Sequence, residues 1–201
     1  CGMTSHDVIG FLRRVLNTKK IGHSGTLDPD AAGVLPVFAG SATRLLEYSA
    51  EDRKSYRAEI TFGVKTDTGD DSGTVTERSS LPACSKEDFS ALLAEFTGRQ
   101  KQLPPMYSAI QINGKRLYDL ARQGIEIERE KRPVTITELK LLSADDTQHI
   151  YQIDVACSKG TYIRTLCADI GEALGCGATM TALRRTEAAG FSIADSITLE
   201  E

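Results

Sequence analysis

A glycine-rich loop holds the first residues whose types and spacing suit chemistry. Residues 22–29 read Gly-His-Ser-Gly-Thr-Leu-Asp-Pro, with an imidazole at His23 and a carboxylate at Asp28. The glycines allow unusual backbone angles, and Pro29 holds Asp28 extended, which can project its carboxylate from the loop. Such a carboxylate suits general-base or nucleophilic chemistry. For an isolated Asp-Pro pair, a plain Asx turn before a strand is the alternative interpretation.

A second segment combines a turn with an arginine. Residues 158–165 leave a predicted strand, turn at Gly160 and enter a predicted helix that carries Arg164. The helix start offers backbone N–H donors, and the arginine offers a planar fork that binds a carboxylate or a phosphate. A helix cap with a surface arginine is the alternative. Tyr56 lies on the apolar face of a third, alternating segment, where a core tyrosine is the simpler interpretation.

Charge is distributed unevenly along the chain. The 201 residues have a net charge of −4, yet residues 99–132 contain eight basic and four acidic residues. That segment therefore carries +4 and the rest of the chain −8. A basic segment on an acidic body is typical of a local anion-binding face, although a solvated surface helix with paired charges has the same composition.

Composition restricts the class of protein. With 40% hydrophobic and 26% charged residues, the chain has the composition of a folded globular protein. It contains no apolar run long enough for a transmembrane helix, and its polar start does not resemble a signal peptide. Five cysteines without a C-x-x-C pair and three scattered histidines argue against a disulfide framework and against a metal site, and favour the cytoplasm.

Hydrophobic periodicity predicts the elements that must hold these residues. A T-x-x-D capping box opens a helix over about 5–17, and strict alternation over 54–62 predicts a half-buried strand. The other predicted helices are 42–48, 85–98, 117–123, 162–174 and 178–183. The other predicted strands are a short one enclosed between Gly33 and Gly40, then 134–142, 150–157 and one near 186–193. Asn113-Gly114 predicts a hairpin turn. The acidic run 65–74 predicts a turn rather than a calcium loop, because it lacks the glutamate that ends such a loop.

These elements indicate the fold class. Strands and helices do not alternate strictly, and the hairpins imply antiparallel pairing. We therefore predict an α+β fold with a central mixed, mainly antiparallel sheet flanked by helices. Residues 1–201 are predicted to form one domain, with residues 101–132 as a basic insertion that has its own hairpin and helix.

Together the segments resemble the bacterial tRNA pseudouridine-55 synthases. The resemblance runs in order along nearly the whole chain and rests on Gly22–Pro29, Lys54–Tyr56, Pro104–Ala109, Gly114–Tyr118, Lys159–Arg164 and Leu183–Arg185. It implies a pseudouridine-synthase-like catalytic domain that isomerises a flipped-out uridine in the T-arm loop of tRNA to pseudouridine. It also implies a cytoplasmic monomer that needs no cofactor, metal, membrane or obligatory protein partner.

The resemblance implies a role for each residue of the pocket. Asp28 matches the family's catalytic aspartate, and Arg164 matches the arginine that pairs with it. Tyr56 matches the tyrosine that packs against the target base, and Leu183 an apolar residue that lines the pocket. His23 matches a histidine that contacts the RNA loop where the base has been vacated. We expect Arg164 to keep a buried Asp28 ionised.

The resemblance also implies that the basic insertion grips RNA. Lys115, Arg116 and Tyr107 are its candidate RNA-binding residues. Ile110-Gln111 stands where the family usually has a lysine, so one contact to phosphate is expected to be weaker. The chain is also expected to lack the family's N-terminal strand and its small C-terminal RNA-binding domain of the PUA type.

Two other functions remain open at this point. One is an RNA-binding or RNA-folding module without turnover, although binding alone does not require both Asp28 and Arg164. The other is a pseudouridine synthase that depends on a guide RNA. The basic insertion argues against it, because the stand-alone bacterial members carry that insertion. A hydrolase using cysteine and histidine is a poor third, because no cysteine lies in a recognisable nucleophile setting.

Overall fold

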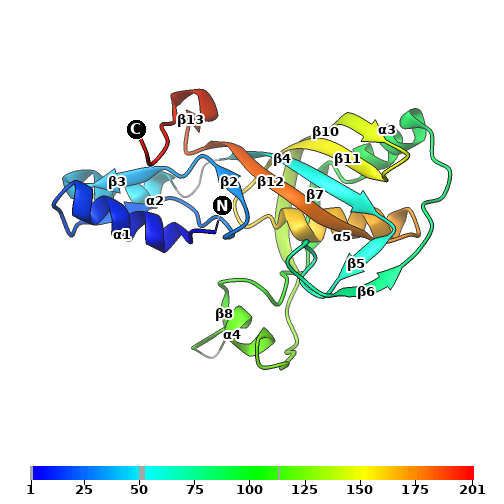
Figure 1. Ribbon diagram of the computed structural model, residues 1–201, viewed down its shortest axis with the longest axis horizontal. Coiled ribbons are helices and arrows are strands. Elements are labelled where there is room, and N and C mark those ends of the chain that lie inside the picture. Colours follow the sequence, from blue (N-terminus) through cyan, green and yellow to red (C-terminus); the bar gives the residue numbers. More distant parts are fainter. Residues whose placement is uncertain (1, 50–52, 113) are drawn as a thin grey trace.

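The computed structural model describes residues 2–49, 53–112 and 114–201, and its largest feature is a seven-stranded sheet (Figure 1). Six strands follow the order β13–β12–β4–β11–β10–β7, and β2 also pairs with β12. Their bounds are β2 Ala32–Gly33, β4 Lys54–Phe62, β7 Gly98–Gln102, β10 Arg132–Asp145, β11 Ile150–Cys157, β12 Ala178–Ala188 and β13 Phe191–Ser192. Every pair is antiparallel except β2–β12, which is parallel. The predicted α+β class with a mixed, mainly antiparallel sheet is therefore confirmed.

The two central strands have the bounds that alternation predicts. β4 buries Tyr56, Ala58, Ile60 and Phe62 on one face, because successive side chains of a strand point to opposite faces. β11 pairs with β4 along its whole length, from Ile150–Thr61 to Cys157–Lys54. Tyr56 thus lies in the middle of the sheet, between β11 and β12.

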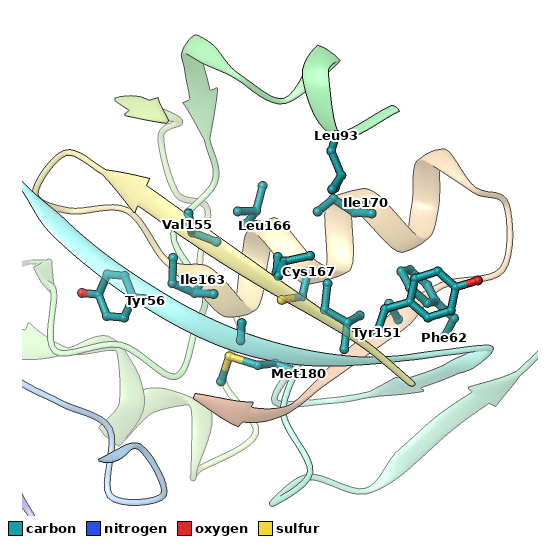
Figure 2. Close-up of a cluster of buried hydrophobic side chains, with 14 of the residues drawn as sticks. Tyr56, Phe62, Leu93, Tyr151, Val155, Ile163, Leu166, Cys167, Ile170 and Met180 are labelled. Atoms are coloured by element: carbon teal, nitrogen blue, oxygen red, sulfur yellow. The ribbon is translucent and has the colours of Figure 1, made fainter. Parts of the chain in front are cut away.

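Two helices cover this buried face (Figure 2). Helix α5, Ile163–Ala173, packs Ile163, Leu166, Cys167 and Ile170 against the strands. Helix α3, Lys86–Glu95, adds Phe89 and Leu93, and an N-cap at Ser85 starts it as predicted. At four turns or fewer, neither helix would be stable alone in water, so the shared apolar core holds both in place.

The N-terminal part of the chain forms a smaller unit beside the sheet (Figure 1). Helix α1, Ser5–Val15, begins with the predicted capping box between Thr4 and Asp7. Strands β1, Ile21–His23, and β3, Val37–Ala39, pair with each other rather than with the main sheet. A 3₁₀ turn, η1 Gly40–Leu45, and α2, Leu46–Ser49, replace the single helix predicted for 42–48.

One helix prediction is wrong, and several short strands were missed, β7 among them. Residues 178–183, predicted as a helix, are the first half of β12, which pairs with β4 from Ala178–Phe62 to Ala188–Lys54. The alanines, Met180 and Leu183 favour a helix, but this preference does not outweigh inter-strand hydrogen bonds in a buried sheet, where Thr179 and Thr181 also fit. The predicted final strand, 186–193, is the end of β12 followed by β13. Strand β7 was missed because Gly98 also fits a helix end.

The basic segment leaves the sheet after β7 and returns at β10. In between it forms β8, Gln111–Ile112, β9, Lys115–Arg116, and α4, Leu117–Ala121. β8 and β9 pair as the predicted hairpin, although Asn113 of its turn lies outside the described residues. Figure 1 shows this excursion projecting away from the sheet. A second small hairpin, β5 Val64–Thr66 with β6 Val75–Arg78, flanks the acidic turn.

Among the helices of the described residues, none has the length and apolar character needed to cross a membrane.

Candidate functional site

The loop with Asp28 is held at several points by hydrogen bonds. Ser5 of α1 accepts from the Leu27 N–H at 2.9 Å and donates back to the Leu27 carbonyl at 3.3 Å. Gly25 has φ +83°, a backbone conformation that glycine adopts without steric cost. The Ala31 N–H donates to the Asp28 carbonyl at 3.0 Å, which closes a turn around Pro29. Asp28 and Pro29 therefore do form a turn. Because backbone groups close it, the Asp28 carboxylate stays available for other contacts.

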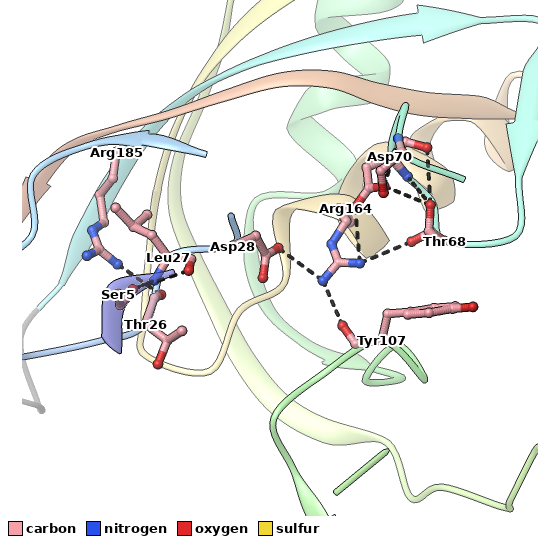
Figure 3. Close-up of polar contacts among 10 residues, drawn as sticks. Ser5, Thr26, Leu27, Asp28, Thr68, Asp70, Tyr107, Arg164 and Arg185 are labelled. Atoms are coloured by element: carbon pink, nitrogen blue, oxygen red, sulfur yellow. Dashed lines mark hydrogen bonds and ion pairs between the residues drawn. The ribbon is translucent and has the colours of Figure 1, made fainter. Parts of the chain in front are cut away.

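Asp28 forms an ion pair with Arg164 across the site (Figure 3). Asp28 Oδ2 lies 3.0 Å from Arg164 Nη2, and the two residues come from distant parts of the chain. The Arg164 side chain is only 6% exposed, whereas that of Asp28 is 45% exposed. The sequence-based expectation of a buried Asp28 is therefore wrong: the arginine is buried, and the carboxylate faces open solvent with one oxygen anchored.

Arg164 also has partners that sequence reasoning missed. Its Nη1 lies 3.3 Å from Asp70 Oδ2 and donates to the Thr68 carbonyl at 3.2 Å. Its Nη2 donates to the Tyr107 carbonyl at 2.8 Å. A guanidinium bound in this way can rotate very little, so it presents Nη2 to Asp28 in one orientation.

Asp70 is oriented by its own loop. Its Oδ1 accepts from the Thr68 hydroxyl at 2.7 Å and from the Ser72 hydroxyl at 2.5 Å. Its Oδ2 is thereby left for Arg164. The only sequence signal for Asp70 was the acidic run 65–74, which we interpreted as a plain turn. The run is a turn, and it also places a second carboxylate on Arg164.

A cleft of about 510 Å³ opens beside this ion-pair network. Its walls come from the Asp28 loop, from the Asp70 loop and from β4 and β12, and they include Leu183 and Met180. Such a volume is typical of small-ligand sites. Five carboxylates and two arginines line it: Asp28, Asp30, Glu59, Asp70, Asp71, Arg57 and Arg184. A neutral group fits such a lining better than a phosphate does, because most of the charges are negative.

Leu183 lies at the sheet side of the cleft, whereas Tyr56 belongs to the buried core and is not among the residues that line the cleft. Leu183 pairs with Ala58 on β4 and is half-buried at the wall of the cleft. Tyr56 is 8% exposed, and burial raises the pKa of its hydroxyl, while the neighbouring Arg185 partly offsets that rise. A buried tyrosine with a raised pKa stays protonated at neutral pH, so it offers an apolar ring and a neutral hydroxyl.

His23 is placed at the end of β1, where it pairs with Val37 of β3. Burial lowers the pKa of its imidazole below 6.5, and the nearby Arg185 guanidinium lowers it further. The ring is therefore neutral at pH 7. It stands on the strand that leads into the Asp28 loop, but it is not among the residues that line the cleft.

We expect the His23 imidazole to titrate below pH 6.5 in the folded chain. The unfolded chain then binds this proton more readily, so the stability that depends on His23 is complete above about pH 6.5 and declines as the pH falls below it. NMR titration of the imidazole measures the pKa, and urea unfolding of wild type and His23→Gln at both ends of the range measures the stability. A midpoint at or above pH 6.5 would contradict the expectation.

The other candidate residues lie in the basic segment. Tyr107 contributes its carbonyl to Arg164, and Lys115 and Arg116 are exposed on the β8–β9 hairpin. Arg116 donates to the Tyr118 hydroxyl at 2.6 Å, and its guanidinium lies 5.8 Å from the centre of that ring. The structure therefore groups Asp28, Arg164 and Leu183 with the Tyr107 backbone, and keeps Lys115 and Arg116 on a separate surface.

Gln102 links this segment to the site and was also missed. It is 3% exposed at the end of β7, and its amide donates to the Tyr162 carbonyl at 3.0 Å and accepts from the Tyr162 N–H at 2.8 Å. Tyr162 is the N-cap of α5, two residues before Arg164. The base of the basic segment is thus bound to the helix that supplies Arg164.

The thiols of the described residues form no hydrogen bond or ion pair with Asp28, Asp70 or Arg164. Cys157, Cys167 and Cys176 are buried free thiols and Cys84 is partly buried. Burial raises the pKa of Cys157 to about 11, so this thiol is protonated at neutral pH. Within the described ranges, no three histidine, cysteine or acidic side chains are grouped to hold a metal ion.

Family models match the chain along most of its length. The model of the TruB family pseudouridylate synthase N-terminal domain matches residues 13–163, and that of the tRNA pseudouridylate synthase B C-terminal domain matches residues 164–201. A tRNA pseudouridine synthase B from Moorella thermoacetica is 54% identical over 202 residues, and one from Alkaliphilus oremlandii is 52% identical over 200 residues. Both alignments include 100% of this chain but 66% of the relative, so the chain spans just under two thirds of their length.

Solved structures with the same architecture come from larger assemblies. A chain in a Cbf5–Nop10–Gar1 complex superposes with a TM-score of 0.71 at 30% identity, over 93% of this chain and 46% of that one. A chain of an H/ACA RNP bound to a substrate RNA containing 2′-deoxyuridine superposes with a TM-score of 0.68 at 27% identity, over 95% and 45%.

Proposed function

We propose that this chain, which belongs to the TruB family of pseudouridylate synthases, isomerises a uridine in the T-arm loop of tRNA to pseudouridine. The observation that carries the proposal is the Asp28 carboxylate, anchored by Arg164 at 3.0 Å and still 45% exposed beside the cleft. A group held on one side and open on the other is what an incoming nucleotide requires. The curated relatives, named tRNA pseudouridine synthase B, support tRNA as the substrate.

The reaction needs only rearrangement of the nucleotide. The N1 glycosidic bond breaks, the base turns, and C5 joins the same sugar carbon, so no net oxidation occurs. Asp28 acts as the carboxylate that starts this sequence, by attack at C1′ or C6 or by removing a sugar proton. Its charge suits each of these steps, and the ion pair with Arg164 keeps it in one orientation.

The target base reaches Asp28 by leaving the stacked loop. Unstacking costs a few kcal/mol, and packing of the flipped base against Tyr56 and Leu183 offsets that cost. His23, neutral because its pKa is lowered, fills the space that the base leaves in the RNA. The phosphates stay outside the acidic cleft. They are bound by the basic segment, including Lys115 and Arg116.

A labelled T-arm hairpin tests the proposal. Replacement of hydrogen at C5 releases tritium from 5-tritiated uridine, so the purified chain, alone and without guide RNA, should release tritium over many turnovers. Binding without release would favour an RNA-binding module, and release only in the presence of a guide RNA would favour a guided synthase. Turnover by the chain alone would also support activity without an obligatory protein partner.

Salt dependence tests the RNA-binding surface. We expect the double variant Lys115→Ala/Arg116→Ala to bind the hairpin more weakly and to flatten the slope of log affinity against log salt by about 0.7–0.9 for each phosphate that is no longer neutralised. Both side chains are exposed, so the fold should be unaffected. The control Arg78→Ala/Lys86→Ala removes the same charge from exposed positions outside the segment. Equal slopes for the two double variants would place the phosphate contacts elsewhere.

A further inference from the structure

Arg185 is the largest fully buried side chain of the described residues, and it is 1% exposed. It lies on β12, opposite Tyr56 of β4. A guanidinium is costly to bury unless its donors are satisfied. Here Nε donates to the Val34 carbonyl at 2.8 Å, Nη1 to the Thr26 carbonyl at 3.3 Å and Nη2 to the Gly25 carbonyl at 3.0 Å.

These three carbonyls belong to the loop that carries Asp28. Gly25 and Thr26 precede the aspartate, and Val34 follows it. One rigid side chain therefore holds both ends of the segment 25–34. Figure 3 shows Arg185 on the side of this loop opposite Arg164, with Asp28 between them.

The backbone of Arg185 holds the same loop. Its carbonyl accepts from the Val34 N–H at 2.9 Å, and β2 pairs in parallel with β12 through Gly33 and Arg185. A Cβ on Gly33 would lie 2.1 Å from the Arg185 carbonyl oxygen, so the approach requires glycine. The loop is thus fixed to β12 by the main chain and by the side chain of one residue.

We propose that Arg185 is the positioning residue of the Asp28 loop, a role that rests on the function proposed for Asp28. It acts through the loop backbone and holds Asp28 at the distance that Arg164 requires. Loss of the guanidinium would release Gly25 and Thr26 and leave Val34 with only its main-chain hydrogen bond to β12. Small displacements of a reacting group cost about a hundredfold in rate. Binding of RNA by the basic segment would be little affected, because that segment lies elsewhere (Figure 1).

Three variants separate positioning from general stability. Arg185→Met keeps the length of the side chain and removes the three donations to the loop, together with the contact of the guanidinium with the Tyr56 hydroxyl. Arg185→Lys keeps the charge without the planar fork, and it tests the same claim if the Met variant does not fold. Arg185→Ala leaves a space that added guanidinium ion can occupy. The control is Arg78→Met, which removes an exposed arginine of β6 that has no part in the site.

The expected result is a change in rate without a matching change in affinity. Single-turnover rate should fall about a hundredfold in Arg185→Met and less in Arg185→Lys, while hairpin affinity stays within about threefold. Guanidinium should restore part of the rate of Arg185→Ala. Hydrogen exchange should quicken at residues 24–34 but not in β4 or β11, and this readout does not depend on turnover.

Other outcomes overturn the proposal. A wild-type rate in Arg185→Met would show that the main-chain pairing of β2 suffices. Faster exchange throughout the sheet, with rate and affinity falling together, would show a purely structural arginine. If wild-type protein released no tritium from the hairpin, the proposed function would fail, while the exchange at residues 24–34 would still test the positioning of the loop.

Discussion

Asp28→Asn should reduce turnover to below about 1% of the wild-type rate, whereas hairpin affinity should stay within about tenfold. Asparagine keeps the shape of the side chain but has no negative charge, so it is a poor nucleophile and a poor base. The loop should keep its conformation, because its hydrogen bonds to Ser5 and Arg185 involve the backbone of residues other than Asp28. Tritium release under single-turnover conditions measures the rate, and filter binding measures the affinity.

Asp30→Asn provides the comparison for this experiment. Asp30 lies on the same loop and at the same cleft, but the ion pairs of Arg164 go to Asp28 and Asp70. Its loss should therefore cost far less than the loss of Asp28. A rate above a few per cent of wild type in Asp28→Asn, or equal losses in the two variants, would remove Asp28 from its proposed role.

Arg164→Met is expected to lower the single-turnover rate by about a hundredfold to a thousandfold, with RNA affinity retained. The guanidinium joins Asp28, Asp70 and two backbone carbonyls, and methionine replaces none of these contacts. Because Asp28 is 45% exposed, water can take the place of Arg164 around its carboxylate. We therefore expect a loss of orientation, which raising the pH should not restore.

Two further variants show which contacts of Arg164 matter. Arg164→Lys keeps a positive charge but loses the fork, so it should recover only part of the rate. Asp70→Asn removes the second carboxylate and leaves the pair with Asp28, so its rate should lie between those of wild type and Arg164→Met. Circular dichroism checks the fold of each variant. A near-normal rate in Arg164→Met would show that the ion pair serves the fold alone.

Local sequence patterns, such as hydrophobic periodicity and capping residues, were sufficient to predict many of the helices and strands. The capping box at Thr4, the strands 54–62 and 150–157 and the helix that carries Arg164 are all present, because each depends on neighbours a few residues away. The same reasoning failed at 178–183. There the choice between helix and strand depended on hydrogen bonds to β4, more than a hundred residues earlier in the chain.

The features of the candidate site also fall into two groups: those that the local sequence predicts and those that depend on the tertiary structure. The sequence by itself determined that Asp28 stands in a turn that projects it, that Arg164 begins a helix, and that both match one family's motifs. Only the tertiary structure decided that Asp70 shares Arg164, that Asp28 is half-exposed, and that Arg185 holds the loop. These contacts join segments far apart along the chain. They arise when the sheet brings β12 and the start of α5 beside the Asp28 loop, and no local spacing of residues encodes that approach.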